Sequence, residues 1–323
     1  MGIFKDDCCF EFEGSNLRVV KKGEVLFDEP ARIQIDKSGR PIAIGNEISD
    51  ETVGIIIYPL KAGAIADFNG FELLIRGVIK KTDKKGGSKF ISFYFNTFTL
   101  VSDTVTEVEI RAVRDSMEHA RARNVYMMYK PYAAIKGLGF ENNHECYILI
   151  NATSEKFEIS VVENKEVKQS NKVPYGNKMI STILKRRMQL DKDIIVNPND
   201  ILLVLKDFNI LSNSNKPIRL KGNKANGLES NIDISIEYFR ELCEPYFTII
   251  ENEIYNTIVE FGEKSSSTIV SLYLIGASAN EYLAKRIEKT IKIPTVLKSE
   301  NDYVLEGLKY FSNCYENDPL TIR

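Results

Sequence analysis

Residues that bind structural metals are scarce in this chain of 323 residues. Its only histidines are His119 and His144, and its five cysteines include no CxxC pair. Structural zinc sites need clustered cysteine and histidine ligands, and an odd set of scattered cysteines does not form a disulfide framework. We therefore expect a reduced protein without a metal site.

An excess of charge of one sign is also lacking. Lysine and arginine total 43 against 45 aspartate and glutamate residues, which gives a formal net charge of -2 at pH 7. A protein that holds nucleic acid needs an excess of basic residues to bind the phosphates. The balance excludes a global basic field and predicts that nucleic acid is not a partner.

Long apolar runs are absent as well. No stretch approaches the run of about 18 apolar residues that spans a bilayer. The first seven residues contain no apolar core of signal-peptide length. We expect a soluble or peripheral protein of the cytoplasm, with the inner face of the cell membrane as the place of any membrane contact.

One segment has the composition of a peripheral membrane contact. Five lysines between Lys80 and Lys89 flank a Gly-Gly turn, and Phe90 and Ile91 follow. Lysines suit anionic head groups, and two apolar side chains suit shallow insertion. Two interpretations stay open: Phe90 and Ile91 insert into a membrane, or this segment begins a buried strand.

Short apolar segments separated by tight turns are what the chain does contain. With 43% hydrophobic residues and a length beyond that of one usual domain, it predicts two lobes. A meander of strands opens the chain and a second follows residue 145, which suggests two similar lobes. The expected strands are Cys8 to Phe12, Leu17 to Val20, Val25 to Phe27, Arg32 to Ile35, Pro41 to Ile44, Cys146 to Ile150, Lys156 to Val162 and Glu166 to Gln169.

Helices are expected after each meander. Thr106 to Glu109 is a capping box ahead of helically spaced apolar residues. A second capping box, Ser278 to Glu281, follows a strand-like run from Ile269 to Ile275 and predicts a helix to about Lys292. Strand, short turn and helix indicate an α/β fold. Residues 197–231, rich in Asn, Ser, Lys and Gly, predict loops and short strands on the outside of the second lobe.

Four segments, in order, resemble the MreB family of bacterial actin-like cell-shape proteins. Residues 28–36 resemble the family's NEPSVVAID and residues 59–68 its RPL+DGVIADF. Residues 106–113 resemble TEVERRAV, and residues 119–126 resemble HAGAREVY with Arg121 in place of glycine. The resemblance covers nearly the whole chain.

The resemblance implies a two-lobed actin-like α/β fold, in which each lobe is a mixed β-sheet with a β-meander start and flanking helices. It places lobe I in residues 1–140, lobe II in residues 141–300 and a C-terminal segment that returns to lobe I in residues 301–323. It also implies an ATP-dependent filament under the membrane that organises cell-wall growth.

The family's first phosphate hairpin, DLGTANT, corresponds to residues 11–17 with one gap. Such hairpins need glycines, because backbone N–H groups must approach the phosphate closely, and an Asp that organises Mg²⁺ and water. Glu11 replaces the Asp, and Glu13 stands where the first glycine belongs and would repel triphosphate. The residues retained at this hairpin are Glu11, Gly14, Ser15 and Asn16.

The second hairpin, DIGGGTTE in the family, corresponds to residues 150–157, which contain neither glycine nor Asp. The family's GGDxMD resembles residues 175–180 without either Asp, and its TGGGS resembles residues 275–278 with one glycine. The retained residues are Asn151, Thr153, Ser154, Gly176, Asn177, Gly276 and Ser278.

The family's EEPMAAAIG contains two glutamates, one of which positions the attacking water. Tyr129 and Lys130 replace them here, so a general base or water-orienting carboxylate is missing. Lys130 and Lys178 have a charge that suits phosphate, but a lysine without a glycine loop is more often a solvated surface residue. Turns explain Gly14, Gly137 and Gly276 equally well.

We therefore expect a filament protein for cell shape or intracellular organisation, not an enzyme and with no bound cofactor. It would assemble with itself or with an intact MreB-like protein. One alternative is a non-polymerising adaptor that binds an intact bacterial actin or a membrane complex. Another is a residual ATP-binding switch with Mg, or a working ATPase rebuilt around Glu11, Glu13 and Asn151.

Overall fold

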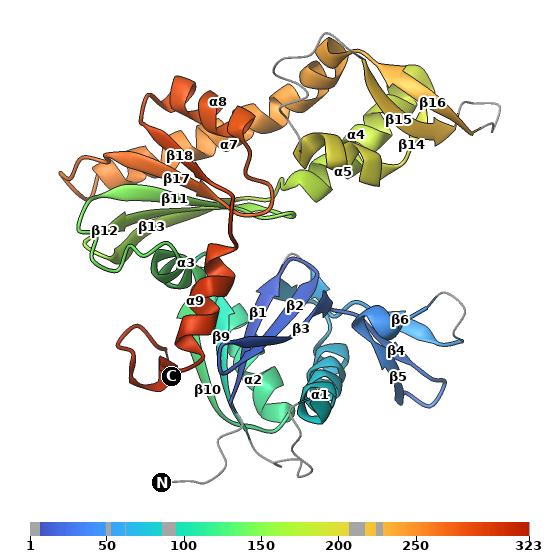
Figure 1. The fold of residues 1–323 in the computed structure, drawn as a ribbon, viewed down its shortest axis with the longest axis vertical. Helices are drawn as coiled ribbons and strands as arrows, with labels where there is room; N and C mark the ends of the chain where they lie inside the picture. The colour runs from blue at the N-terminus through green and yellow to red at the C-terminus, as the bar shows by residue number, and fades with distance from the viewer. Residues whose placement is uncertain are drawn as a thin grey trace. The chain divides into compact units, whose positions relative to one another are not determined.

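The computed structural model describes residues 7–49, 53–61, 63–85, 95–206, 217–223 and 229–322 (Figure 1). The chain divides into two compact units. Unit 1 comprises Met1–Glu141 and Tyr303–Arg323, and unit 2 comprises Asn142–Asp302. Phe90 and Ile91 lie outside the described residues, so their predicted membrane contact stays a prediction.

Unit 1 is built on a five-stranded mixed sheet in the order β10-β9-β1-β2-β3. Strand β1 pairs antiparallel with β2 and parallel with β9, and β9 pairs parallel with β10. The meander predicted from the alternating apolar residues is therefore confirmed. The strands are β1 (Cys8–Glu13), β2 (Asn16–Lys21), β3 (Glu24–Pro30), β9 (Phe95–Val101) and β10 (Ala122–Tyr129).

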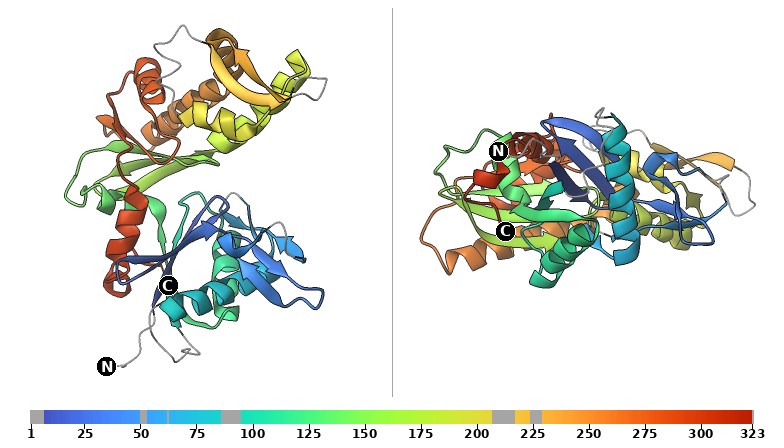
Figure 2. Two further views of the ribbon diagram at one scale, coloured as in Figure 1. Left: turned by 45° about the vertical axis from the view of Figure 1, so that its right-hand side comes forward. Right: turned by 90° about the horizontal axis from the view of Figure 1, so that it is seen from below.

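Helices cover both faces of this sheet (Figures 1 and 2). One face packs against α1 (Phe68–Lys85) and α2 (Glu107–His119), which bury apolar residues at helical spacing in one core with the strands. On the other face Phe98 of β9 contacts Phe311 of α9 (Tyr303–Phe311). Helix α3 (Lys130–Gly137) packs against α9.

Glycines allow α3 and α9 to approach closely. A Cβ on Gly137 would lie 2.0 Å from the carbonyl oxygen of Tyr303, and one on Gly307 would lie 1.9 Å from that of Ala133. The explanation of Gly137 by a turn is wrong, because it is the last residue of α3 and serves this helix contact. The contact fixes the start of α3 relative to the C-terminal segment.

Unit 2 repeats the strand order of unit 1, as β13-β12-β11-β17-β18. Its first three strands form the antiparallel meander, and β11, β17 and β18 are parallel. The repetition agrees with the second meander in the sequence. The strands are β11 (Tyr147–Ala152), β12 (Phe157–Glu163), β13 (Glu166–Val173), β17 (Ser271–Ile275) and β18 (Thr295–Lys298).

The helices of unit 2 enclose a second large apolar core. Figure 2 shows α7 and α8 beside the main sheet and α4 and α5 beside a smaller one. Among the described residues, no helix has the length and apolar character needed to cross a membrane. The helices are α4 (Asn177–Lys192), α5 (Pro198–Lys206), α7 (Ile236–Gly262) and α8 (Glu281–Ile291).

Each unit also carries small accessory sheets. Unit 1 has the three-stranded sheet β5-β4-β6 and the hairpin β7-β8, and unit 2 has the three-stranded sheet β14-β15-β16. The elements are β4 (Ile33–Ile35), β5 (Pro41–Ile44), β6 (Ile55–Ile57), β7 (Leu60–Lys61), β8 (Ala64–Ile65), β14 (Ile195–Val196), β15 (Ile218–Asn223) and β16 (Glu229–Ile234), with 3-10 turns η1 (Gly45–Glu47) and η2 (Tyr315–Asn317).

Residues 198–206 correct one sequence prediction. They were expected to be loop or short strand, but they form α5. The polar composition around this segment obscured a helical spacing, since Ile201, Val204 and Leu205 are buried in the core of unit 2. Packing of that apolar face decides the conformation.

The two predicted capping boxes have different outcomes. Thr106 caps α2 as predicted, because its Oγ1 accepts from the Glu109 N–H while Glu109 accepts from the Thr106 N–H. The second box correctly predicts a helix, α8, but not its cap: Asn280 is the N-cap, and its side chain accepts from the Leu283 N–H at 2.9 Å. The hydroxyl of Ser278 donates instead to the carbonyl oxygen of Thr153 at 2.8 Å.

A buried ion pair joins α7 to α8. Arg286 donates from Nε to Glu251 at 2.5 Å and from both Nη atoms to Glu244 at 2.6 and 2.7 Å. The side chain of Glu251 is only 7% exposed. The hydrogen bonds from Arg286 lower the pKa of the Glu244 carboxyl below its ordinary value of 4.5.

We predict that Arg286→Met lowers the free energy of unfolding by about 3 kcal/mol at pH 7, because it leaves Glu251 buried without its partner. Chemical denaturation measures this. A lowered carboxyl pKa stabilises the folded state above the unfolded value and ceases to do so as pH falls through the folded value, so the gap to wild type narrows in acid.

The control for this prediction is Arg219→Met, which removes an ion pair between exposed side chains of β15 and β16. It is expected to leave the unfolding midpoint unchanged. Equal midpoints for Arg286→Met and wild type at pH 7 would contradict the stabilising role of the α7–α8 pair.

Candidate functional site

The β1–β2 hairpin of unit 1 holds the residues that the resemblance assigns to the first phosphate loop. Gly14 and Ser15 form a two-residue turn, with Gly14 at a φ of 59° that favours glycine. Neighbouring segments donate hydrogen bonds to the carbonyl oxygens of this turn. The Gly63 N–H donates to the Gly14 carbonyl at 2.9 Å, and the Ala31 N–H donates to the Ser15 carbonyl at 2.7 Å. Asn16 opens β2 and is exposed.

Glu11 is paired with a basic residue across the hairpin. It faces Arg18 in the β1–β2 register and is 1% exposed. Arg18 Nη1 donates to Glu11 Oε2 at 3.2 Å and lies 3.5 Å from Glu13 Oε2, while its Nε donates to Asp28 at 3.1 Å. One guanidinium therefore serves three carboxylates.

A second cation, on helix α3, reaches the same carboxylate. Lys130, the first residue of α3, is 4% exposed, and its Nζ donates to the carbonyl oxygen of Phe12 at 2.6 Å. The same Nζ lies 3.7 Å from Glu11 Oε1. The expectation that Lys130 is a solvated surface lysine is wrong, because its ammonium compensates a buried carboxylate.

In unit 2 the β11–β12 turn contains internal hydrogen bonds. The Thr153 N–H donates to the Lys156 carbonyl at 2.9 Å, and the Lys156 N–H donates to Thr153 Oγ1 at 3.1 Å. Thr153 is 3% exposed. Two backbone donors of the turn are thus already used within it, whereas a phosphate-binding loop would aim such donors at the ligand.

The neighbouring loops of unit 2 close on this turn. The Gly176 and Lys178 N–H groups at the start of α4 donate to the carbonyls of Glu155 and Ser154 at 2.9 and 2.8 Å. Ser278 donates from its backbone N–H to Ala152 and from its hydroxyl to Thr153, each at 2.8 Å. The three segments that the resemblance assigns to the nucleotide therefore bind one another.

Close backbone contact explains the two glycines retained in these segments. A Cβ on Gly176 would lie 2.5 Å from the backbone of Ser154, and one on Gly276 would lie 2.6 Å from the Ala152 carbonyl oxygen. Gly276 also has a φ of 97°. Both positions serve packing against the β11–β12 turn.

Ion pairs fill the polar positions around the turn. Lys156 lies 2.6 Å from Glu158, which is 3% exposed and also accepts from the Asn151 amide at 3.2 Å. Lys178 pairs with Glu155 at 3.1 Å and is largely exposed, in agreement with the expectation for this lysine. Asn177 is 4% exposed and its amide approaches the carbonyl of Leu205 in α5.

The residues present do not fit a magnesium nucleotide. Glu11 is compensated by Arg18 and Lys130, and Glu13 adds negative charge at the first hairpin. The second hairpin carries a carboxylate, Glu155, where the family has a glycine-rich loop. Among the described residues, no cluster of three or more His, Cys, Asp or Glu has the arrangement of a metal site.

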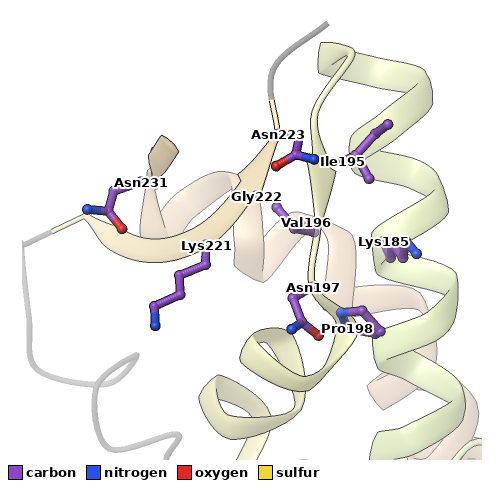
Figure 3. Close-up of a pocket in the computed structure, with 9 residues that line it drawn as sticks. All are labelled: Lys185, Ile195, Val196, Asn197, Pro198, Lys221, Gly222, Asn223 and Asn231. Carbon is purple, nitrogen blue, oxygen red and sulfur yellow. The ribbon is translucent and has the colours of Figure 1, made fainter. Parts of the chain in front are cut away.

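A cavity of about 580 Å³ lies elsewhere in unit 2, between α4, β14 and β15. Figure 3 shows its polar lining, which includes Lys185, Lys221 and Asn197. Lys221 and Asn197 are exposed, and the cavity includes none of the residues predicted from the sequence. We assign no ligand to this cavity.

The family model described as MreB/Mbl protein matches residues 13–318. The chain belongs to the MreB/Mbl family. Among curated relatives, the cell shape-determining protein Mbl of Bacillus cereus is 30% identical over 148 residues, which cover 43% of this chain and 43% of that protein. The cell shape-determining protein MreB of Escherichia coli K12 is 28% identical over 187 residues, 54% of this chain and 53% of that protein. The chain thus spans about half the length of the curated relatives it matches.

Solved structures of similar fold cover almost the entire chain. MreB5 of Spiroplasma citri bound to AMPPNP has a TM-score of 0.79 at 17% identity, covering 98% of both chains. The MamK double helical filament has a TM-score of 0.75 at 14% identity, covering 97% of this chain and 100% of MamK. The predicted actin-like α/β fold is confirmed.

The sequence analysis did not single out Arg18, although it pairs with Glu11 at the candidate site. A signal was available, because the two-residue turn Gly14–Ser15 fixes the register and places Arg18 opposite Glu11. The same logic pairs Asn151 with Glu158. No comparable rule places Lys130, which follows β10 in the chain and reaches β1 through packing of α3.

We predict that Gly176→Ala lowers the free energy of unfolding by about 2 kcal/mol, because the added methyl overlaps the backbone of the β11–β12 turn. Urea unfolding provides the measurement. Gly262→Ala is the matched control: a Cβ at this exposed end of α7 meets nothing within 4 Å, so its stability should stay equal or rise slightly. Equal stability of both variants would contradict the prediction, because it would show that the turn accommodates the added methyl group.

Proposed function

We propose that this member of the MreB/Mbl family is a cytoskeletal protein that acts by assembly, with little or no ATP hydrolysis. Its role would be in cell shape or intracellular organisation. Family membership over residues 13–318 and the likeness to the MamK double helical filament support the assembly part of the proposal. The site geometry supports the absence of turnover.

The burial of Lys130 is the observation that supports the proposed lack of ATP hydrolysis. It stands where the family's EEPMAAAIG has a glutamate, and it is buried with its Nζ bonded to the Phe12 carbonyl. An ammonium has three donors and no acceptor, so it neither takes a proton from water nor accepts the hydrogen bond that orients one. Hydrolysis at this position therefore loses its activating group.

Loss of the nucleotide switch has a consequence for assembly. In a switching filament, contacts to the γ-phosphate bias the subunit toward one conformation. A subunit without those contacts assembles constitutively, or it joins filaments of an intact relative. We place this activity in the cytoplasm, with a peripheral contact at the inner face of the membrane as part of the proposal.

The test combines sedimentation with phosphate release, using the purified chain of residues 1–323 with and without ATP and Mg²⁺. We predict that the pelleted fraction is the same in both conditions and that phosphate release stays at the buffer rate. An intact family member, Escherichia coli MreB, run in parallel supplies the positive control.

Other outcomes identify the alternatives. Phosphate release that disappears in Glu11→Ala would refute the proposal and favour an ATPase rebuilt around that carboxylate. A chain that stays monomeric alone, and pellets only with an intact relative, would favour the adaptor.

A further inference from the structure

Glu11 presents an electrostatic problem that its surroundings must solve. Its carboxylate is 1% exposed, and an ionised carboxylate that is removed from water needs a compensating charge and hydrogen bonds. Arg18 supplies part of that charge, but the same guanidinium also serves Glu13 and Asp28. One guanidinium is thus shared among three carboxylates.

The oxygens around Lys130 are those that a hard cation would take. Its Nζ lies 2.6 Å from the carbonyl oxygen of Phe12 and 3.7 Å from Glu11 Oε1. Carboxylate and backbone carbonyl oxygens are the ligands that Mg²⁺ and Ca²⁺ use in proteins. The ammonium therefore faces one carbonyl oxygen and one carboxylate oxygen, which are two of the ligand types that a hard cation uses.

The position of Lys130 is set by its helix. Lys130 is the first residue of α3, and Pro131 follows it. Close contacts at Gly137 and Gly307 hold α3 against α9. Because the cation belongs to the chain, it is present at every nucleotide and metal concentration. A bound ion would link β1 to its surroundings only when loaded.

We propose that the Lys130 ammonium is a built-in substitute for a divalent cation, which locks the β1–β2 hairpin to α3 without a metal or nucleotide. This inference deepens the proposed function. It rests on that function in one respect: the β1–β2 hairpin is taken not to hold a magnesium nucleotide. It makes two separate claims: Lys130 compensates Glu11, and a carboxylate in its place would create a site for a divalent cation.

The first claim is tested by a double-mutant cycle followed by thermal melting of the full chain. Lys130→Met should lower the melting temperature by on the order of 10 °C, because it removes a compensating charge from the buried Glu11 carboxylate. Glu11→Gln together with Lys130→Met should recover most of that loss, and Glu11→Gln alone completes the cycle. Lys178→Met, an exposed lysine in an ion pair, is the control and should shift melting by less than about 2 °C.

The cycle remains decisive if Lys130→Met does not fold. Folding of the double variant alone would then support compensation of Glu11. Equal loss in the single and double variants, or failure of both to fold, would overturn the claim, since the lysine would then act through packing.

The second claim uses Lys130→Glu and Lys130→Gln, melted in Mg²⁺ or Ca²⁺ without nucleotide. Wild type and Lys130→Gln should be indifferent to either ion, whereas Lys130→Glu should melt higher as the ion concentration rises, by mass action on the folded state. A rise in wild type, or no rise in Lys130→Glu, would overturn the substitution of ion by lysine.

These readouts are independent of the proposed function. Phosphate release or ATP-dependent pelleting by wild type would refute that function even if the cycle shows coupling. A failed cycle would leave constitutive assembly standing.

Discussion

Compensation of the buried Glu11 carboxylate is the constraint on which the first hairpin depends. Strand β1 lies in the middle of its sheet, so any acidic side chain in its interior must find its cations inside the fold. Arg18 meets it across the β1–β2 ladder, and Lys130 meets it from α3. The arrangement links a sheet, a helix and, through the glycine contacts of α3 with α9, the C-terminal segment of unit 1.

Unit 2 holds its corresponding hairpin in place by a different means. Its β11–β12 turn has no glycine, and its backbone groups bond to Gly176, Lys178 and Ser278. Ion pairs hold the first hairpin, and hydrogen bonds to the carbonyl oxygens of the turn hold the second. Each of these hairpins occupies the equivalent place in one of two units with the same strand order. The family's fold is thus retained while the chemistry of both loops has changed.

Much of the fold was predictable because its signals are local. Period-two apolar patterning gave the meanders, and the Thr106 capping box gave the start of α2. The failures were also physical. Helix α5 forms because its apolar face packs into a core that polar composition did not reveal. Asn280 caps α8 in place of Ser278, because the Ser278 hydroxyl bonds to the β11–β12 turn.

The sequence by itself determined the family and the fold class, because these depend on residue type and order. It also contained the Glu11–Arg18 pair, since a two-residue turn fixes which side chains face each other. Only the tertiary structure decided that Lys130 is buried against Glu11, or that Asn177 turns toward α5. Those contacts join segments far apart in the chain, and their energies depend on burial, which no local pattern specifies.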